Sequence, residues 1–307
     1  MTALLRITLL EWLVAALAFG QQTAPGGTTS VAGIFSSTIF STANRDDARA
    51  ALKVCFDRLR PKDGDRIDSS VEIVDSLGEI RDRLRTHSAS LVALSVFEYL
   101  ELENTHLMVP VLTDARGARG ALYSYVLLVN RASGISTAAG LRGKNLLTYS
   151  RGKGRVAGIW LEAFLARERL GRPASFFGTV KMTDKPQTCI LSLFFGSADG
   201  CVVDEVNLDV AKEMNPQLGQ LLVVAKSHPL IESVIAVPAE PRPYQAELID
   251  GMLGLTRSAG GRQLLVVFKT DRLVRLQAGD LDSARELWSD YRRLGGPPPG
   301  GRDKERR

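Results

Sequence analysis

The feature of this 307-residue chain that most restricts its fold is a repeated alternation of strand-like and helix-like segments. Residues 91–94 form a short, wholly apolar run, which is typical of a strand buried on both faces of a sheet. Residues 155–170 instead repeat apolar side chains at helical spacing, and Gly171 with Pro173 closes the predicted helix. Repeated strand–helix–strand units predict parallel sheets with crossover helices, an α/β architecture.

The rest of the chain continues this alternation. The same criteria predict strands at residues 29–35, 70–74, 106–112, 121–129, 145–149, 180–182, 200–203, 221–225 and 234–237, and helices from near residue 44 and over 77–84, 190–194, 243–255, 259–267 and 283–294. In α/β sheets, ligands bind beyond the carboxyl ends of the strands, where helix N-termini point at the crevice. Side chains at those ends are therefore the first candidates for function.

The two termini differ in composition from the rest of the chain. An apolar run over residues 7–19 follows a positive charge, and Ala16–Ala18 offers the small residues that a signal peptidase requires. We expect a signal peptide over residues 1–20, a linker over 21–30 and a periplasmic location, with anchoring by an uncleaved signal as the alternative. The charged, Pro/Gly-rich residues 295–307 predict a disordered tail.

Charge and cysteine content argue against several classes of protein. The net charge is +5, but the arginines are scattered and no basic stripe with aromatics is present, which argues against nucleic-acid binding. The three cysteines, Cys55, Cys189 and Cys201, can form at most one internal disulfide, and we interpret all three as small buried apolar residues. No metal-ligand spacing is present, so no metal or cofactor is predicted.

Catalytic patterns are also missing from the sequence. No Gly-x-Ser-x-Gly motif occurs, and no paired carboxylates can be placed together from the sequence. A spatial pairing of Cys189 or Cys201 with His228 stays open at this point. We therefore expect a protein that is not an enzyme.

The strongest candidate for ligand binding is a glycine-rich, cationic turn between a predicted strand and a predicted helix. Its residues are Ser150, Arg151, Gly152, Lys153, Gly154 and Arg155. Glycines let the backbone approach a ligand, and free N–H groups at a helix start attract anions. The alternative is a basic turn that only faces solvent.

The remaining candidates follow or begin predicted strands. They are Ser95, Tyr99, Tyr123, Tyr125, Thr183, Asp184 and Asp204. Tyrosine pairs an apolar body with a hydroxyl donor, which suits a ligand crevice as well as a protein core. The acidic residues could accept hydrogen bonds from an amine, or could simply cap the helices that follow them.

Four segments follow one another in the order found in a known family. They are Arg-Ala-Ser-Gly-Ile at residues 131–135, Leu-Arg-Gly-Lys at 141–144, Phe-Phe-Gly-Ser-Ala-Asp-Gly-Cys-Val-Val at 194–203 and Glu-Met-Asn-Pro-Gln-Leu at 213–218. With them, residues 31–275 resemble the phosphonate- and phosphate-type periplasmic substrate-binding proteins of ABC transporters.

The resemblance implies a type II periplasmic-binding fold. Two α/β lobes, each a mostly parallel sheet flanked by helices, are joined in that fold by two crossover strands, here expected near residues 111–123 and 218–225. Lobe one combines residues 31–114 and 221–294, and lobe two covers residues 120–219. The ligand sits between the lobes and drives hinge closure.

The resemblance also implies roles for individual residues. Tyr99, and either Tyr123 or Tyr125, match tyrosines that contact the ligand, and Asp204 matches an acidic position that holds an amine in aminophosphonate binders. The family's Ser-Thr-Ser-Gly turn is replaced in this chain by residues 151–154, Arg-Gly-Lys-Gly. Loss of the hydroxyls puts phosphonate itself in doubt, while the added cations favour another small anion.

The function implied is that of a monomeric solute-binding protein that delivers a small anionic ligand to an ABC permease. The alternative is a sensory module of the same fold that acts with a separate membrane sensor kinase. Neighbouring permease and ATPase genes would favour the first function, and a histidine-kinase gene the second.

Overall fold

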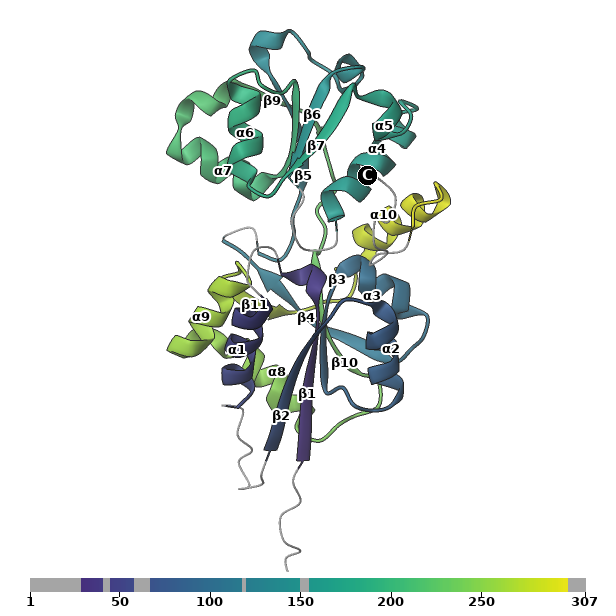
Figure 1. Cartoon of the computed structure of the whole chain (residues 1–307), viewed down its shortest axis with the longest axis vertical. Helices are drawn as coiled ribbons and strands as arrows, with labels where there is room; N and C mark the ends of the chain where they lie inside the picture. Colours follow the sequence, from purple (N-terminus) through teal and green to yellow (C-terminus); the bar gives the residue numbers. More distant parts are fainter. Residues whose placement is uncertain (1–28, 41–44, 58–66, 118–119, 150–154, 298–307) are drawn as a thin grey trace, which may run out of the picture.

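A computed structural model describes residues 29–40, 45–57, 67–117, 120–149 and 155–297. The expected signal peptide, most of the linker, the turn at residues 150–154 and the last ten residues of the expected tail lie outside these ranges. The described residues form two α/β lobes, one above the other in Figure 1, each built on its own sheet.

Lobe one is a six-stranded sheet with the order β11-β4-β10-β3-β1-β2. Its strands are β1 (Thr29–Ser36), β2 (Ile67–Val74), β3 (Leu91–Ser95), β4 (Met108–Ala115), β10 (Ser233–Pro238) and β11 (Arg272–Arg275), and its helices are α1 (Arg45–Phe56), α2 (Leu77–Arg85), α3 (Val96–Glu103), α8 (Gln245–Leu253) and α9 (Ala259–Val267). β1, β2 and β3 are parallel, and β10 lies antiparallel between β3 and β4. The carboxyl ends of β1, β3 and β4 therefore reach the same edge of the sheet.

β3 explains why this sheet is covered on both faces. Val92 and Leu94 belong to one apolar core, with α2 and α3, and Leu91 and Ala93 belong to a second core, with α1, α8 and α9. Side chains alternate across a strand, so a continuous apolar run needs apolar partners on both sides. The wholly apolar run at residues 91–94 is thus buried on both faces of the sheet, as predicted.

Lobe two is a five-stranded sheet with the order β7-β6-β8-β5-β9. Its strands are β5 (Tyr125–Asn130), β6 (Asn145–Tyr149), β7 (Thr179–Thr183), β8 (Gly200–Asp204) and β9 (Leu221–Lys226), and its helices are α4 (Val156–Arg167), α5 (Pro173–Phe176), α6 (Pro186–Phe194) and α7 (Glu205–Met214). Short 3-10 turns lie at Ser37–Ile39, Arg131–Ser133, Ala138–Leu141, Pro216–Gln220 and Leu255–Arg257. α4 covers one face of this sheet, and α6 and α7 cover the other.

The cysteines correct one sequence-based interpretation. Cys189 and Cys201 are fully buried, as predicted, but they form a disulfide with a Cα–Cα distance of 5.7 Å. The bond ties α6 to β8 within lobe two. Sequence alone could not pair them, because the 12-residue separation says nothing about which faces of the helix and strand meet.

The chain crosses between the lobes twice, after β4 and after β9. The two crossings are hydrogen-bonded to each other: the backbone N–H groups of Tyr123 and Leu230 each donate to the other residue's carbonyl, both at 2.9 Å. The predicted second crossing, residues 218–225, lies too early, because β9 pairs with β5 in the sheet of lobe two. Alternation alone does not show which sheet a strand joins.

α10 (Asp282–Arg293) contacts both lobes (Figure 1). Toward lobe one, the Trp288 ring stacks on Phe97 of α3 with ring centroids 5.2 Å apart, and Arg285 forms an ion pair with Glu103 at 2.7 Å. On its other side, α10 packs against α4 of lobe two. α10 is therefore a third connection between the lobes, made by packing instead of by the chain.

Candidate functional site

The two sheets present their carboxyl edges to each other. In lobe two, β6, β7 and β8 are parallel and end at Tyr149, Thr183 and Asp204. This edge faces the edge of lobe one at which β3 and β4 end (Figure 1). Because α/β sheets bind ligands beyond the carboxyl ends of their strands, the region between the lobes is the candidate site.

A group of buried and half-buried polar side chains lies at this junction. We call it the junction cluster; it contains Asp114, Arg116, Tyr123, Tyr125, Asp204, Glu232 and Ser233. Its members come from the ends of β4, β5, β8 and β10 and from both crossings. These residues come together because every strand that contributes one begins or ends at the interlobe edge.

Asp114 is the centre of the part that belongs to lobe one. Its carboxylate accepts a hydrogen bond from the Tyr123 hydroxyl at 2.8 Å and another from the Ser233 hydroxyl. Burial raises the pKa of Tyr123, and the charges of Asp114 and Glu232 raise it further. Tyr123 therefore stays protonated and serves as a donor to Asp114.

Tyr125 and Glu232 form a parallel pair on the other side of the crossings. The Tyr125 hydroxyl donates to the Glu232 carboxylate, and the ring stacks on Trp160 of α4 with centroids 6.5 Å apart. Complete burial raises the pKa of Tyr125 well above its usual value, and the charge of Glu232 acts in the same direction. The Glu232 carbonyl accepts from the N–H of Val96, at the start of α3, at 2.9 Å. This pair links the hinge to both lobes.

Arg116 brings positive charge to the cluster. Its half-buried guanidinium lies over the Tyr123 ring, 5.9 Å from the centroid, and donates to the Lys269 carbonyl. Burial acts to lower the pKa of Arg116, but its electrostatic interactions with Tyr123 and with the carboxylates of Glu232, Asp204 and Asp114 outweigh burial and raise the pKa overall. A guanidinium has five N–H donors, so Arg116 can bind an acceptor group of a ligand as well.

Asp204 caps a helix, which is one of the two roles that its position in the sequence allows. It is the N-cap of α7, and one carboxylate oxygen accepts from the Asn207 backbone N–H at 2.9 Å. The Asn207 side-chain amide donates to the other oxygen. Asp204 lies opposite Tyr125 in the pairing of β8 with β5. The structure thus brings Asp204, Tyr123 and Tyr125 together at the junction, and their contact with a ligand stays a prediction.

Ser95 also lies at the interlobe edge but is fully buried. Its hydroxyl is the N-cap of α3 and forms a capping box with Glu98. The Glu98 carboxylate, itself buried, also accepts from Ser36 at 2.7 Å and from Thr38. Four polar residues from the ends of β1 and β3 thus satisfy one another beneath the site.

Tyr99 points away from the junction cluster. Its hydroxyl donates to Glu103 at 3.4 Å, on the side of α3 that meets α10. Burial raises the pKa of Tyr99 to about 12, and the charge of Glu103 contributes to this increase. A role of Tyr99 in ligand contact stays a prediction that this geometry does not support directly.

The other predicted residues lie in lobe two. Thr183 ends β7, a strand at the edge of the sheet, and Asp184 follows it; the Thr183 hydroxyl accepts from the Lys185 N–H at 3.3 Å. Arg155 is exposed and has a left-handed backbone with φ of 63° before α4. Ser150, Arg151, Gly152, Lys153 and Gly154 lie outside the described residues. Their role therefore stays a sequence-based prediction.

Sequence reasoning missed four members of the cluster: Asp114, Arg116, Glu232 and Ser233. A signal was present, because Asp114 follows the predicted strand at 106–112 and Ser233 precedes the predicted strand at 234–237. Polar residues that flank two predicted strands of the same lobe could have been nominated together. Only the strand order, however, shows that β4 and β10 are neighbours.

Two further polar atoms lie buried on the α4 side of lobe two, without a hydrogen-bond partner among the described residues. Within the described ranges, the buried Thr148 hydroxyl and the buried Trp160 indole N–H make no hydrogen bond. Thr148 is next to the last residue of β6, and Trp160 packs on Tyr125. Unpaired buried polar groups are costly, so bound water or a ligand atom is the natural partner for each.

Two kinds of feature are absent from the described part of the chain. No group of three or more His, Cys, Asp or Glu side chains there could hold a metal ion. No helix in the same ranges has the length and apolar character that a membrane span requires.

Known structures share this two-lobed architecture. XAC2383 from Xanthomonas citri bound to ATP is 17% identical, with a TM-score of 0.61 over 87% of this chain and 98% of that one. PhnD1 from Prochlorococcus marinus in complex with methylphosphonate is 13% identical, with a TM-score of 0.55 over 88% and 99%. A binding protein component of an ABC phosphonate transporter (PA3383) from Pseudomonas aeruginosa is 12% identical, with a TM-score of 0.55 over 88% of each chain. These likenesses confirm the predicted two-lobed periplasmic-binding fold.

Sequence comparison then gives the family. No curated protein matches the sequence. The family model described as "ABC transporter, phosphonate, periplasmic substrate-binding protein" matches residues 38–281, well over half of the chain. This is a family of transport solute-binding proteins and not a class of enzymes. The protein therefore belongs to the periplasmic phosphonate substrate-binding family of ABC transporters.

Proposed function

We propose that this protein is the solute-binding component of an ABC uptake system and captures a small, phosphonate- or phosphate-like anion between its lobes by hinge closure. The observation that carries the proposal is the arrangement of two α/β lobes with facing carboxyl edges and two hydrogen-bonded crossings. This arrangement lets one lobe rotate against the other, with a shift of the apolar contacts that α10 makes to both lobes.

Arg116 and the cationic sequence at residues 150–155 support an anionic ligand, whereas the three carboxylates of the junction cluster do not. Asp114, Glu232 and Asp204 accept hydrogen bonds from protein donors, whereas Arg116 retains N–H groups beyond the one bonded to Lys269. The cationic residues 150–155 follow β6 in the sequence, and β6 ends at this edge. Methylphosphonate in PhnD1 and ATP in XAC2383 both carry phosphorus oxyanions, which agrees with a ligand of this class.

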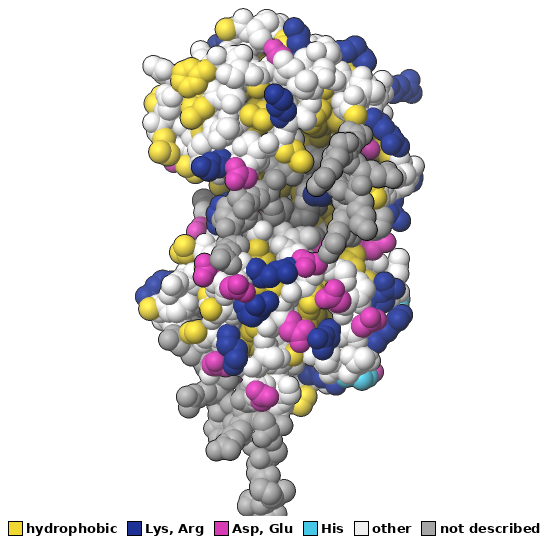
Figure 2. Space-filling view, in the orientation of Figure 1, with side chains coloured by type: hydrophobic (Ala, Val, Ile, Leu, Met, Phe, Trp, Pro, Cys, Tyr) yellow, Lys and Arg dark blue, Asp and Glu magenta, His cyan; other side chains and the backbone are white. Residues whose placement is uncertain are grey.

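Export and a membrane partner complete the proposal. A disulfide between Cys189 and Cys201 is compatible with an oxidising compartment such as the periplasm. Figure 2 shows apolar side chains gathered on lobe two, over α6 and α7. Leu191, Val210 and Met214 are exposed on these two helices, and Phe195 is exposed just after α6. Exposed apolar patches mark protein contact sites, and a permease is the partner that the family implies.

A ligand screen tests the proposed function. Phosphate, phosphite, methylphosphonate, an alkyl sulfonate and a dicarboxylate are added to the full chain, and thermal shift and titration calorimetry report binding. We expect saturable binding of at least one phosphorus oxyanion and a smaller radius of gyration in solution scattering. Failure of every anion to shift the unfolding temperature would contradict the proposal.

Two arginine variants sharpen this test. Arg116→Gln removes the charge at the junction and should weaken binding at least tenfold, because charge-assisted hydrogen bonds are the strong ones. Arg293→Gln, on the exposed end of α10, removes an equal charge far from the junction and should leave the affinity unchanged. If the two variants weakened ligand binding equally, the affinity would depend on the overall charge of the protein and not on Arg116.

A further inference from the structure

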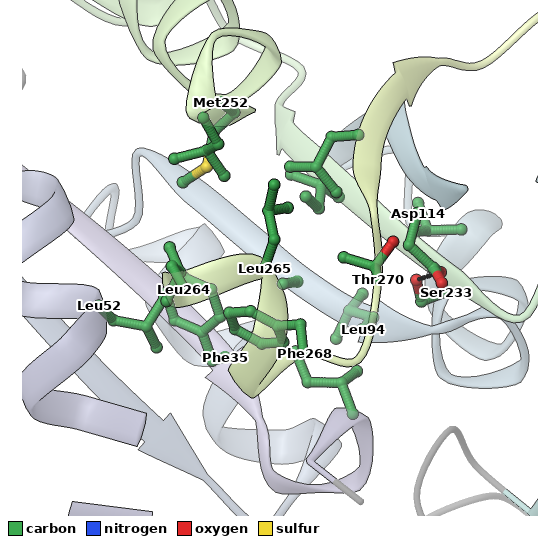
Figure 3. Close-up of a pocket in the computed structure, with 16 residues that line it drawn as sticks. Phe35, Leu52, Leu94, Asp114, Ser233, Met252, Leu264, Leu265, Phe268 and Thr270 are labelled. Atoms are coloured by element: carbon green, nitrogen blue, oxygen red, sulfur yellow. Dashed lines mark hydrogen bonds between the residues drawn. The ribbon is translucent and has the colours of Figure 1, made fainter. Parts of the chain in front are cut away.

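Lobe one encloses a core cavity of about 50 Å³ that belongs to this lobe alone (Figure 3). Its wall is apolar, and on its polar side the Ser233 hydroxyl donates to the Asp114 carboxylate. Every residue that lines it comes from an element of lobe one or from a turn between two of them. A rotation of the lobes therefore leaves this cavity unchanged, and a space that responds to the rotation has to lie between the lobes.

Such a space lies between α4 of lobe two, the second crossing and α10. We call it the α4–α10 gap; its volume is about 30 Å³. The second crossing contributes Ser227, His228 and Leu230 to its wall. α10 is held on lobe one by the stacking of Trp288 on Phe97. The gap therefore has walls that belong to different lobes, and its width must change when the lobes rotate.

The two helices face the gap with stripes of the same spacing. Both stripes follow the pattern i, i+3, i+4, i+7, which is one face of a helix. They are Trp160, Ala163, Phe164 and Arg167 on α4, and Ser283, Glu286, Leu287 and Asp290 on α10. Facing stripes of two packed helices normally interdigitate. Here they leave room for about one or two water molecules, so the helices are not fully packed along the gap.

α4 and α10 run in the same direction beside the gap. Arg172 lies shortly after the end of α4, and it donates to the carbonyl of Leu294, directly after the end of α10, at 2.8 Å. Because the ends of the two helices meet, Arg167 at the end of α4 faces the C-terminal part of the α10 stripe. That part carries Glu286 and Asp290, which lie about one helical turn apart on the same face.

Opposite charges thus face each other across the gap without forming an ion pair. Among the described residues, neither Arg167 nor Glu286 makes an ion pair or a side-chain hydrogen bond, and Asp290 pairs with Arg293 of its own helix. A guanidinium has five N–H donors, so Arg167 can bind both carboxylates at once when the helices come closer. The gap keeps apart groups that attract each other, and another arrangement of the lobes would complete their contact.

We propose that α4 and α10 form a latch between the lobes, which this structure shows in its open form. In a second arrangement of the lobes the gap closes, Phe164 packs against Leu287, and Arg167 binds the carboxylates of Glu286 and Asp290. Burial of the apolar part of both stripes and the charge pairing stabilise the closed form. The gap is too small for an organic ligand, so the facing helices are the partners for each other's charges. The latch acts without a ligand and does not depend on the proposed function.

Pulsed electron resonance between spin labels on the two lobes tests the latch in the ligand-free full chain. The labels are attached at Asp82→Cys on α2 and at Gln217→Cys in lobe two, both exposed positions, and Cys55→Ser removes the cysteine outside the disulfide. We expect a second interlobe distance beside that of this structure. About 1 M sodium chloride should reduce the population of the closed form, because salt screens the charges across the gap.

Charge reversal separates the latch from other causes of lobe motion. Arg167→Glu places like charges on both sides of the gap and should reduce the population of the closed form about threefold, as expected for an exposed ion pair. Arg167→Glu combined with Glu286→Arg restores opposite charges and should restore the closed form. Arg131→Glu reverses an exposed charge at the far end of β5 and should leave the distances unchanged.

A variant that fills the gap gives a second readout, which also decides the matter if the reversed variants do not fold. Ala163→Val adds methyl groups to the gap from the α4 stripe, so it should hold the helices in the observed arrangement and remove the second distance. A second distance that Ala163→Val leaves in place would overturn the latch.

The comparison of the charge variants decides whether the facing stripes are the cause. A distance distribution that Arg167→Glu changes and the double variant restores supports the latch. Identical distributions of the wild type and Arg167→Glu would overturn it, and so would an equal effect of Arg131→Glu or a double variant that resembles Arg167→Glu alone. Because no ligand is added, the latch can fail while the proposed anion site stands, and the anion site can fail while the latch stands.

Discussion

At the scale of single residues, two buried phenol–carboxylate pairs hold the hinge, and one of them can be tested by deleting an oxygen atom. Tyr123→Phe removes the hydroxyl that donates to Asp114 at 2.8 Å. A buried carboxylate that loses a donor is left with part of its desolvation cost uncompensated, so unfolding should become easier by about 1–3 kcal/mol. Urea denaturation measures the change.

The control for this deletion is Tyr99→Phe. The Tyr99 hydroxyl donates to Glu103 at 3.4 Å, a long bond to a group that Arg285 also binds. The same loss of one oxygen atom should therefore cost less than in Tyr123→Phe, within about 1 kcal/mol. An equal or larger cost for Tyr99→Phe would show that the bond between Tyr123 and Asp114 is not a main source of hinge stability.

The raised pKa of Tyr99 also predicts how the stability of the protein changes at alkaline pH. Folding raises its pKa from 10.0 to about 12, through burial and the charge of Glu103. The folded state then holds the proton more tightly than the unfolded chain, so the resulting stability is fully present below pH 10 and is lost as pH rises to about 12. The difference in unfolding free energy between wild type and Tyr99→Phe should shift against the wild type over this interval. If the difference in unfolding free energy between the two proteins stayed constant over this pH interval, the pKa of Tyr99 would not be raised by folding.

At the scale of elements, the disulfide stabilises lobe two by joining α6 to β8. Cys189→Ala combined with Cys201→Ala should lower the free energy of unfolding by about 3 kcal/mol, as for a closed loop of similar length. A reducing agent should lower the unfolding temperature of the wild type and leave that of the double variant unchanged. Equal sensitivity of both proteins to the reductant would show that this bond is not the cause.

The bounds of helices and strands could be predicted well from the sequence where one face is apolar, and less well where a segment is apolar throughout. The helical spacing at residues 259–267 predicts a helix, and α9 has the same bounds, Ala259–Val267. The apolar face of the helix gives the spacing, and a serine caps its first turn. The predicted strand at 121–129 begins too early, since β5 starts at Tyr125 after the crossing. Both segments are apolar, and only hydrogen-bond partners distant in sequence separate a crossing from a sheet strand.

The candidate site was predictable to a similar degree. Tyr123, Tyr125 and Asp204 could be nominated because each adjoins a predicted strand; the structure places all three in the junction cluster, and their contact with a ligand stays a prediction. Asp114 and Arg116 were missed, since their importance depends on contacts with Tyr123, which returns from the other side of the hinge. Capping roles, such as that of Ser95, look the same in sequence as ligand contacts, because both place a hydroxyl before a helix.

At the scale of the whole molecule, α10 restrains the motion that ligand capture requires. Its Trp288 and Arg285 bind α3 of lobe one, while its opposite side packs on α4 of lobe two. Beyond its end, the Leu294 carbonyl accepts from Arg172 of lobe two at 2.8 Å. Any rotation of the lobes must shear these contacts, so α10 should favour the observed relative position of the lobes.

Loosening α10 should therefore widen the range of lobe positions. Trp288→Ala removes a largely buried ring and should cost about 3–5 kcal/mol of stability, and the ligand-free protein should show a larger radius of gyration in solution scattering. Arg172→Gln removes only the bond to Leu294 and should give a smaller increase with little loss of stability. Arg293→Ala, whose side chain is 74% exposed, should change neither quantity. An unchanged radius in both Trp288→Ala and Arg172→Gln would mean that α10 packs on the lobes without restraining them, and that the two crossings alone set the hinge.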